Sequence, residues 1–441
     1  MLICYYSSDK INNMAKQLVL ERNNHHKYLF FAVAVLILLI YGRDMFQINV
    51  SSVVFTAISI AIALPMTYNV YMCYLFFLYP LANGLPGSYM MPLLALLWFI
   101  KKRNLPSKPA LLFFVIISFS EVLHFMSYQF DCDYLMAVRY LSCFFLFVAS
   151  ISDMSNDSSQ HVKRAEFFVL GTVIAVLCII IRTYLLGALD AFDIIRVGEL
   201  ENIDESLGGK IMLSMNPNAM AFVAVTSISI CLCLYQKKVV GNKLLLISAI
   251  IVLLVSVFLS LSRSGVLVLG FLLVLFSFSG RGSKGMTAIL VVGIVLIGVI
   301  YFMNEYGVLE LLFGRFSDET ASSGGNRTDV LKSYNKFLAD NNKYLWFGTG
   351  AVYSKVVAGF ETSMHNSIQQ ILVSYGIFGL TLFVWAAIKL AKQFRHSKFI
   401  AWIPVIVVLL NMQTIQFLIP FAMLYPIVAA FEVVKGINTS N

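Results

Sequence analysis

The sequence predicts an all-α polytopic membrane protein, and three observations lead to this fold class. Of the 441 residues, 59% are hydrophobic and only 12% are charged. The mean hydropathy of +0.82 exceeds what the core of a soluble globular protein can use. The apolar runs are continuous instead of alternating, which excludes a single transmembrane β-barrel. A lipid bilayer is therefore the first expected partner of the chain.

The apolar runs predict about 12 to 14 transmembrane helices, since a span needs about 20 residues. The first four runs are short, and some of them could be re-entrant or merged. The residues through Lys27 are polar and basic and lead into an apolar run with no small-residue cleavage site, which indicates a retained span and not a signal peptide. The predicted spans begin near Leu29, Val50, Tyr71, Met90, Pro109, Tyr134, Ala165, Pro217, Leu244, Gly265, Met286, Ile368, Phe399 and Phe417.

Clusters of Lys and Arg between the spans fall on one side of the predicted membrane. They are KKRNLPSK at Lys101, HVKR ending at Arg164, KKVVGNK at Lys237, GRGSKG at Gly280 and KQFRHSK at Lys392. Positive loops mark the cytoplasmic side, so both termini are expected there. This distribution explains the net charge of +9 without a nucleic acid partner.

The opposite, outer face carries two longer loops within what we treat as a single integral membrane domain over residues 1–441. The loops span residues 187–216 and 304–367. The second has a soluble composition, and NRTDVLKSYNKFLADNNKYLWFG within it favours helices. A long structured loop usually carries function, although it can also be a simple connector.

One arginine interrupts an apolar run of 36 residues from Leu244 to Ser279. As a single helix this run would be about 54 Å long, far more than the hydrocarbon core. A hairpin is therefore expected, with its turn at SRSG. This places Arg263 at the outer membrane boundary, where a guanidinium is much less costly.

Further arginines are expected near the same level: Arg139 and Arg182 in spans, and Arg196 and Arg327 in the outer loops. Positive charge on the outer face opposes the topology rule, so it needs a reason. Converging guanidinium groups bind a pyrophosphate well, which makes these residues candidate substrate ligands. For Arg139 and Arg182, snorkelling to lipid phosphates or pairing with an acid such as Glu121 is an equal alternative.

A Gly-rich turn leads to His365 at the mouth of a predicted span. Histidine suits a general base near neutral pH, although a histidine at a helix start is often structural. Asn366 can cap the helix, and Gln369 lies on the same helical face, so both are candidate substrate ligands. Glu121 and His124, at positions i and i+3, form a rival constellation that could relay protons.

The sequence predicts no metal and no cofactor. It contains no Walker A loop and no GxGxxG motif after a strand. Its cysteines and histidines do not have metal-ligand spacing. No internal repeat is evident, which weakens a transporter interpretation.

Four segments in order resemble the O-antigen polymerase (Wzy) and O-antigen ligase (WaaL) superfamily of membrane glycosyltransferases. They are NPNAMAFVAV, SLSRSGVLVL, NRTDVLKSYNKFLADNNKYLWFGTGAV and MHNSIQQILVSYGIFGL. The resemblance covers mainly Asn216 to Leu380 and implies a GT-C-like fold. It implies that Arg263 and Arg327 bind the pyrophosphate of an undecaprenyl-linked donor and that His365 acts beside the acceptor. Arg139, Arg182 and Arg196 match no motif of the family.

Three functions are consistent with these observations. The first is a polymerase that joins undecaprenyl-pyrophosphate-linked glycans, as donor and acceptor, into O-antigen or a similar polysaccharide without a metal. The second is a ligase that moves finished chains to lipid A core, and the third is a flippase or transporter that uses Glu121, His124 and Arg139. The resemblance further implies the bacterial inner membrane, a site that faces the periplasm, and a chain-length regulator as a possible partner.

Overall fold

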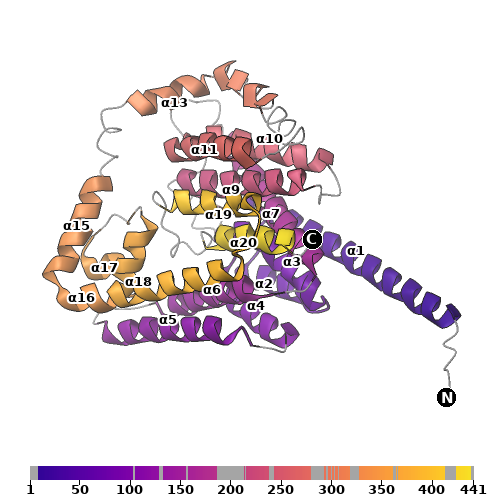
Figure 1. Ribbon diagram of the computed structural model, residues 1–441, viewed down its shortest axis with the longest axis horizontal. Coiled ribbons are helices and arrows are strands. Elements are labelled where there is room, and N and C mark those ends of the chain that lie inside the picture. Colours follow the sequence, from indigo (N-terminus) through magenta and orange to yellow (C-terminus); the bar gives the residue numbers. More distant parts are fainter. Residues whose placement is uncertain are drawn as a thin grey trace.

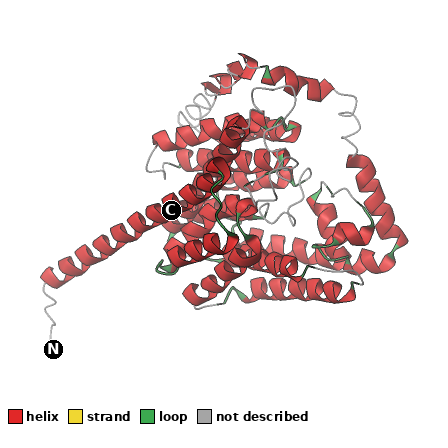
Figure 2. Cartoon of the chain, turned by 180° about the vertical axis from the view of Figure 1, so that it is seen from behind, coloured by secondary structure: helices red, strands yellow, loops and turns green. Residues whose placement is uncertain are grey.

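A computed structural model of the chain describes most of its residues. The described ranges are 8–102, 105–128, 133–154, 157–185, 213, 215–237, 243–279, most of 293–317, 327–360, 364, 366–412 and 424–438. Every regular element in these ranges is a helix, and none of them is a strand (Figures 1 and 2). The all-α prediction is confirmed.

The first helices are short after a long initial one. They are α1 Ser8–Phe46, α2 Ser52–Ala63, α3 Tyr68–Leu78, the 3₁₀ helix η1 Tyr79–Gly84 and α4 Gly87–Lys102. Helices α2 and α3 have 12 and 11 residues. At 1.5 Å per residue they are about 18 and 16 Å long, shorter than the hydrocarbon core. Neither helix crosses a bilayer by itself, in agreement with the short runs of the sequence.

The remaining helices follow the predicted runs closely. The central ones are α5 Lys108–Ser127, α6 Tyr134–Ser152, α7 Ser158–Leu185, α9 Pro217–Gln236, α10 Lys243–Leu259 and α11 Arg263–Ser279. The last ones are α13 Val308–Ser317, α15 Arg327–Asp340, α16 Asn342–Phe347, α17 Ser354–Ala358, α18 Ser367–Gln393, α19 Phe399–Asn411 and α20 Tyr425–Asn438. Six helices among the described residues are long and apolar enough to cross a membrane, or up to seven if one bent pair is a single span. The chain is a multi-pass membrane protein.

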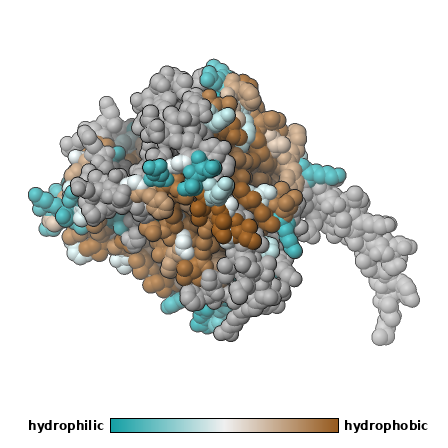
Figure 3. Space-filling model, turned by 90° about the horizontal axis from the view of Figure 1, so that it is seen from above, coloured by the Kyte–Doolittle hydropathy of each residue, from teal (hydrophilic) through white to brown (hydrophobic). Residues whose placement is uncertain are grey.

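Helix α9 occupies the centre of the bundle, and α5 lies at its edge. The most apolar 18-residue window of α9 is 89% buried, whereas that of α5 is 17% buried. Large apolar side chains remain exposed on the outer helices, including Leu38, Phe119 and Phe378. Figure 3 shows the resulting broad apolar surface, with hydrophilic residues toward its edges. Such a surface is suited to lipid contact.

The outer-loop helices and the N-terminal part of α1 lie at opposite ends of the bundle. Figure 1 shows α15, α16 and α17 together at one end, while the first half of α1 projects from the other. The helices of residues 327–358 therefore gather at one end of the bundle.

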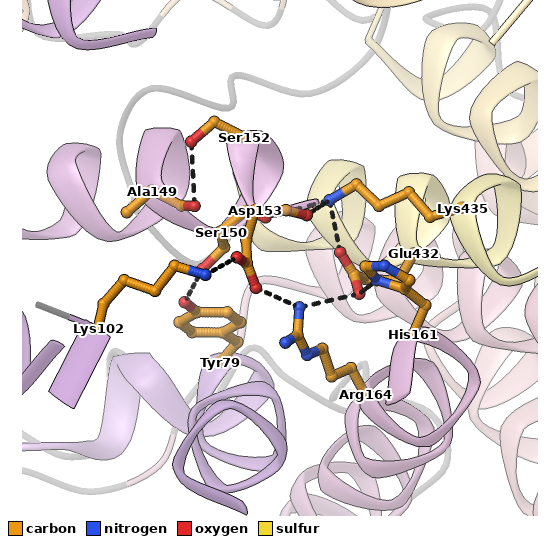
Figure 4. Close-up of polar contacts among 10 residues, drawn as sticks. All are labelled: Tyr79, Lys102, Ala149, Ser150, Ser152, Asp153, His161, Arg164, Glu432 and Lys435. Carbon is orange, nitrogen blue, oxygen red and sulfur yellow. Dashed lines mark hydrogen bonds and ion pairs between the residues drawn. The ribbon is translucent and has the colours of Figure 1, made fainter. Parts of the chain in front are cut away.

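A buried ion cluster joins four parts of the bundle (Figure 4). Asp153, which follows α6, pairs with Lys102 of α4 at 2.6 Å and with Arg164 of α7 at 2.7 Å. Glu432 of α20 lies 3.5 Å from the same Arg164 guanidinium and 2.7 Å from Lys435. These contacts tie the last helix to the middle of the chain.

Two more groups complete the cluster in Figure 4. His161 contacts Glu432 through Nδ1 at 2.6 Å. Lys435 also donates to the backbone carbonyls of Ser150 and Asp153. Buried charges are tolerated only when they are paired and hydrogen-bonded in this way, so the cluster fixes how these helices pack.

Candidate functional site

The turn between α10 and α11 carries Arg263. Helix α10 ends at Leu259 and α11 begins at Arg263, so the apolar run is a hairpin, as predicted from its length. Leu261 adopts a left-handed conformation with φ of 48°, which closes the tight turn. The Ser262 hydroxyl accepts a hydrogen bond from the Gly265 amide at 3.3 Å and caps the new helix. Arg263 is half-buried in the first turn.

The start of α9 lies beside the start of α11. Asn216 caps α9 by accepting a hydrogen bond from the Asn218 amide. The Ser262 hydroxyl donates to the Asn218 side chain at 2.8 Å, and a Cβ on Gly265 would lie 2.6 Å from that of Ala221. Two helix N-termini and one arginine therefore meet at one place. Their combined positive potential favours an anion.

Helix α18 is broken at Gly376, which has a φ of 67° and a ψ of −169°. The Val373 and Ser374 carbonyls near the break accept hydrogen bonds from the Thr349 and Gly350 amides, each at 2.8 Å. The GTG turn of the outer loop thereby inserts against the break and satisfies backbone groups that a continuous helix would have paired. Gly348, which starts the turn, also has a positive φ of 76°.

Three side chains near the end of α5 bind the same turn from the other side. Glu121 accepts a hydrogen bond from the Ala351 amide. His124 Nε2 lies 2.9 Å from the Gly348 carbonyl oxygen, and the Tyr128 hydroxyl donates to the Thr349 carbonyl. The rival pair from the sequence, Glu121 and His124, thus holds the return of the outer loop.

The outer loop forms a small core of its own on the outer half of α18. Tyr334 and Leu338 of α15 are buried with Met364 and Val373. Burial raises the pKa of the Tyr334 phenol to about 12, which keeps it neutral. This core fixes α15 relative to α18.

Polar contacts connect the same two helices. The Gln369 amide nitrogen donates to the Leu331 carbonyl at 3.0 Å and to the Asn335 side chain at 3.3 Å. Leu331 is one helical turn after Arg327, the first residue of α15. The sequence placed Gln369 among the substrate ligands, and in the structure its amide lies at the junction of α15 and α18.

Asn366 caps α18, as the sequence predicted. Its side-chain oxygen accepts hydrogen bonds from the Ile368 and Gln369 amides at 2.9 and 3.1 Å. The Ser367 amide donates to the Met412 carbonyl, which joins the start of α18 to the end of α19. His365 and Arg196 lie outside the described residues, as does the side chain of Arg327.

The remaining predicted arginines lie in membrane helices. Arg139 is half-buried in the second turn of α6. Arg182 is buried near the end of α7, with 3% of its surface exposed. The contacts given for the described residues do not bring Arg139 or Arg182 together with Arg263.

Arg43 and Asp44, near the end of α1, were not among the site residues predicted from the sequence. Arg43 pairs with Asp44 at 2.5 Å and donates to the Gly84 carbonyl at 2.7 Å. Asp44 accepts a hydrogen bond from the Leu213 amide at 2.9 Å. Two adjacent opposite charges at the end of an apolar span were the signal that could have revealed this contact.

An apolar cavity of about 510 Å³ lies between α5, α6, α18, α19 and α20. It extends from Ile368, in the first turn of α18, to Ser107 and Lys389 near the other end of these helices. Phe113, Phe383 and Trp402 are among its lining residues. One end therefore lies close to the Asn366 cap, and its lining suits a hydrocarbon chain.

Residues 247–384 match a family model, Wzy_C, described as O-antigen ligase. The chain carries a Wzy_C domain. This finding confirms the resemblance to the O-antigen polymerase and ligase superfamily and indicates a glycan-transferring enzyme. The Wzy_C domain contains the α10–α11 hairpin, α15, the GTG turn and most of α18. No curated protein matches the chain.

The arrangement can bind an anion and a polar acceptor at one membrane face. Arg263 adds a guanidinium to two helix N-termini, and α15 brings the backbone of Arg327 to the outer part of α18. Such groups stabilise negative charge on a phosphoryl leaving group. No set of three or more His, Cys, Asp or Glu side chains in the described ranges lies close enough to hold a metal ion.

Proposed function

We propose that this protein is a polymerase that joins undecaprenyl-pyrophosphate-linked repeat units into O-antigen or a similar surface polysaccharide. The reaction takes place on the periplasmic face of the bacterial inner membrane, and both termini are cytoplasmic. The observation that carries the proposal is the junction of α15 and α18 within the Wzy_C domain. It brings the start of the Arg327 helix to the helix that follows His365.

In the proposed reaction, a hydroxyl of the acceptor sugar attacks the anomeric carbon of the donor. The bond from that carbon to the pyrophosphate oxygen breaks, and undecaprenyl pyrophosphate leaves. His365 accepts the hydroxyl proton, while Arg263 and Arg327 stabilise the charge that develops on the leaving group. The energy comes from the activated donor. The apolar cavity that begins at Ile368 supports a lipid-linked substrate.

Arg139, Arg196, Asn366 and Gln369 are proposed to contribute further to glycan or pyrophosphate binding. Asn366 and Gln369 lie in and beside the first turn of α18, next to the proposed base. Asn366 accepts a hydrogen bond from the Gln369 amide, and the Gln369 side chain contacts α15, which supports a role for both residues in shaping this part of the site.

The test compares variants in purified protein supplied with lipid-linked repeat units. Arg263→Ala, Arg327→Ala and His365→Ala are each expected to lower the elongation rate by about 10² to 10³-fold. Arg395→Ala and His396→Ala are matched controls, because these residues are exposed at the far end of α18. Full elongation by all three site variants would refute the assignment.

A ligase is the second candidate, because the description of the matched family favours it. The two activities differ in the acceptor. A ligase extends lipid A core and makes no polymer from lipid-linked repeats alone. The same preparation, supplied with each acceptor in turn, separates them by the size of the glycan formed.

A further inference from the structure

The ends of α1 and α7 bring two buried arginines together. Arg43 is 7% exposed and Arg182 is 3% exposed. Both guanidinium groups lie near enough to the Cys178 thiol to interact with it electrostatically. Cys178 precedes Arg182 by one helical turn on the same face of α7. Its thiol contacts Asp44 at 3.8 Å, which places all four side chains in one cluster.

Among the described residues, the charges of this cluster do not balance. The cluster holds two guanidinium groups and the carboxylate of Asp44, whose oxygens already contact Arg43, Cys178 and the Leu213 amide. Arg43 Nη2 and Arg182 Nε and Nη1 are buried and have no hydrogen-bond partner among the described residues. Buried charged donors without partners are unfavourable. Three unused donors and an excess positive charge therefore indicate an anionic ligand.

The cluster lies beside the start of α9. A Cβ on Gly84 would lie 2.7 Å from Leu213, so this segment packs tightly on the carbonyl that Arg43 binds. The chain then runs to the Asn216 cap, and Asn218 contacts Ser262, the residue before Arg263. The Arg43 and Arg182 cluster is thus connected through one short segment to the proposed donor site.

We propose that Arg43 and Arg182 bind the pyrophosphate of the lipid-linked acceptor, so that the protein holds two pyrophosphate groups at once. This inference rests on the proposed function. Planar guanidinium donors match phosphoryl oxygens, and three guanidinium nitrogens are available for them. A polymerase joins two undecaprenyl-pyrophosphate-linked glycans, whereas transfer to lipid A core uses one. The second site therefore favours polymerase over ligase.

Binding stoichiometry tests the proposal directly. The protein is placed in nanodiscs of phosphatidylcholine, titrated with undecaprenyl pyrophosphate and weighed by native mass spectrometry. The wild type is expected to bind two molecules, and the double variant Arg43→Gln, Arg182→Gln is expected to bind one. Arg263→Ala should also bind one, and Arg395→Gln should bind two. A single site in the wild type, or two in the double variant, overturns the proposal.

A phospholipid headgroup offers the same phosphoryl chemistry, so a second arm separates the sources. Phosphatidylglycerol is added to the nanodiscs at the same molar amount as undecaprenyl pyrophosphate. Retention of both pyrophosphate lipids supports the acceptor site. Displacement of one of them in the wild type, but not in the double variant, assigns the cluster to anionic phospholipid and overturns the proposal.

Kinetics with two acceptors separates this inference from the proposed donor site. Arg182→Gln is expected to raise the KM for the lipid-linked acceptor about 10- to 150-fold. The rate with a soluble glycan acceptor that lacks pyrophosphate should not change. Arg182→Lys keeps the charge and should recover part of the affinity, which a folding defect would not allow. A rise in the donor KM instead would overturn the acceptor assignment, whereas an active Arg263→Ala would contradict only the donor site.

Discussion

Gly348 of the outer loop and Gly376 of α18 pack backbone against backbone. A Cβ on Gly348 would lie 2.3 Å from the Ser374 carbonyl carbon, and a Cβ on Gly376 would lie 2.2 Å from the Trp346 carbonyl oxygen. Both residues have a positive φ. The close approach allows the GTG turn to reach the carbonyls beside the helix break, so the site depends on two positions that have no side chain.

Alanine at either glycine should destabilise the folded protein. Both glycines combine a positive φ with a ψ near 180°, a backbone region that costs about 1–3 kcal/mol with a side chain, and overpacking costs about 1–3 kcal/mol more. The thermal midpoint of the purified protein measures the effect. Gly359→Ala is the matched control, because Gly359 has a φ of 73° but no atom within 4 Å of its Cβ position. An equal loss in Gly359→Ala and Gly348→Ala would contradict the packing argument.

Glu121→Ala should weaken the attachment of the GTG turn to α5. The substitution leaves the buried Ala351 amide without its acceptor, which costs about 1–3 kcal/mol. Glu121→Gln keeps a carbonyl oxygen for this amide and should retain most of the stability and the elongation rate. The measurements are the thermal midpoint and glycan elongation of both variants. Loss of function in Glu121→Gln, with intact folding, would favour the transporter alternative, which needs a titrating carboxyl.

The Asp153 cluster should make the stability fall at acidic pH. Burial opposes ionisation, but the Arg164 guanidinium and the Lys102 ammonium outweigh it and hold the pKa of Asp153 at about 2, below its ordinary value of 3.8. A lowered folded pKa contributes stability that is present above the ordinary value and is lost as the pH falls toward 2. The measurement is the thermal midpoint of the purified protein at a series of pH values between 6 and 2.

Asp153→Asn removes the same contribution at neutral pH. Breaking a buried ion pair costs about 3–5 kcal/mol, so the variant should be strongly destabilised at pH 7 and lose less upon acidification. Asp340→Asn changes an exposed acid at the end of α15 and serves as the control. An Asp153→Asn protein as stable as the wild type at pH 7 would show that the cluster does not hold the helices together.

Gln369→Ala should loosen α15 without unfolding the bundle. It removes the donor to the Leu331 carbonyl, a change worth about 0.5–1.5 kcal/mol. Amide hydrogen exchange in residues 327–340 should accelerate, and elongation should decrease because Arg327 begins the same helix. Asn335→Ala removes only the longer contact and should have the smaller effect. Unchanged exchange in Gln369→Ala would exclude this role.

The length of the apolar runs predicted much of the fold, because the thickness of the bilayer determines how many apolar residues a span needs. The α10–α11 hairpin and the Asn366 cap were predicted because local chemistry determines them. Contacts between segments that are distant in the sequence could not be predicted from local chemistry or from span length. Glu121 suggested a relay or an ion pair, and only the folded chain shows its bond to the Ala351 amide.

The Arg43 and Asp44 pair was missed for a related reason. In the sequence, Arg43 and Asp44 are an ordinary charged pair at the end of a span. Their role depends on Arg182 and Leu213, which later segments of the chain bring into the same cluster. The ion cluster around Arg164 was also read only as part of a positive loop. Once such loop charges are buried and paired, they hold helices together. Whether they are buried depends on the tertiary packing of the chain.

The order of synthesis gives the contacts of Glu432 and Lys435 a further meaning. Asp153 and Arg164 precede α20, the helix that carries Glu432 and Lys435, by more than 250 residues in the chain. Until α20 packs against α7, Arg164 has one of the two counter-ions that the described residues provide for it. The packing of α20 therefore completes the charge pairing of this cluster, and the helices around it are expected to associate fully only once α20 is in place.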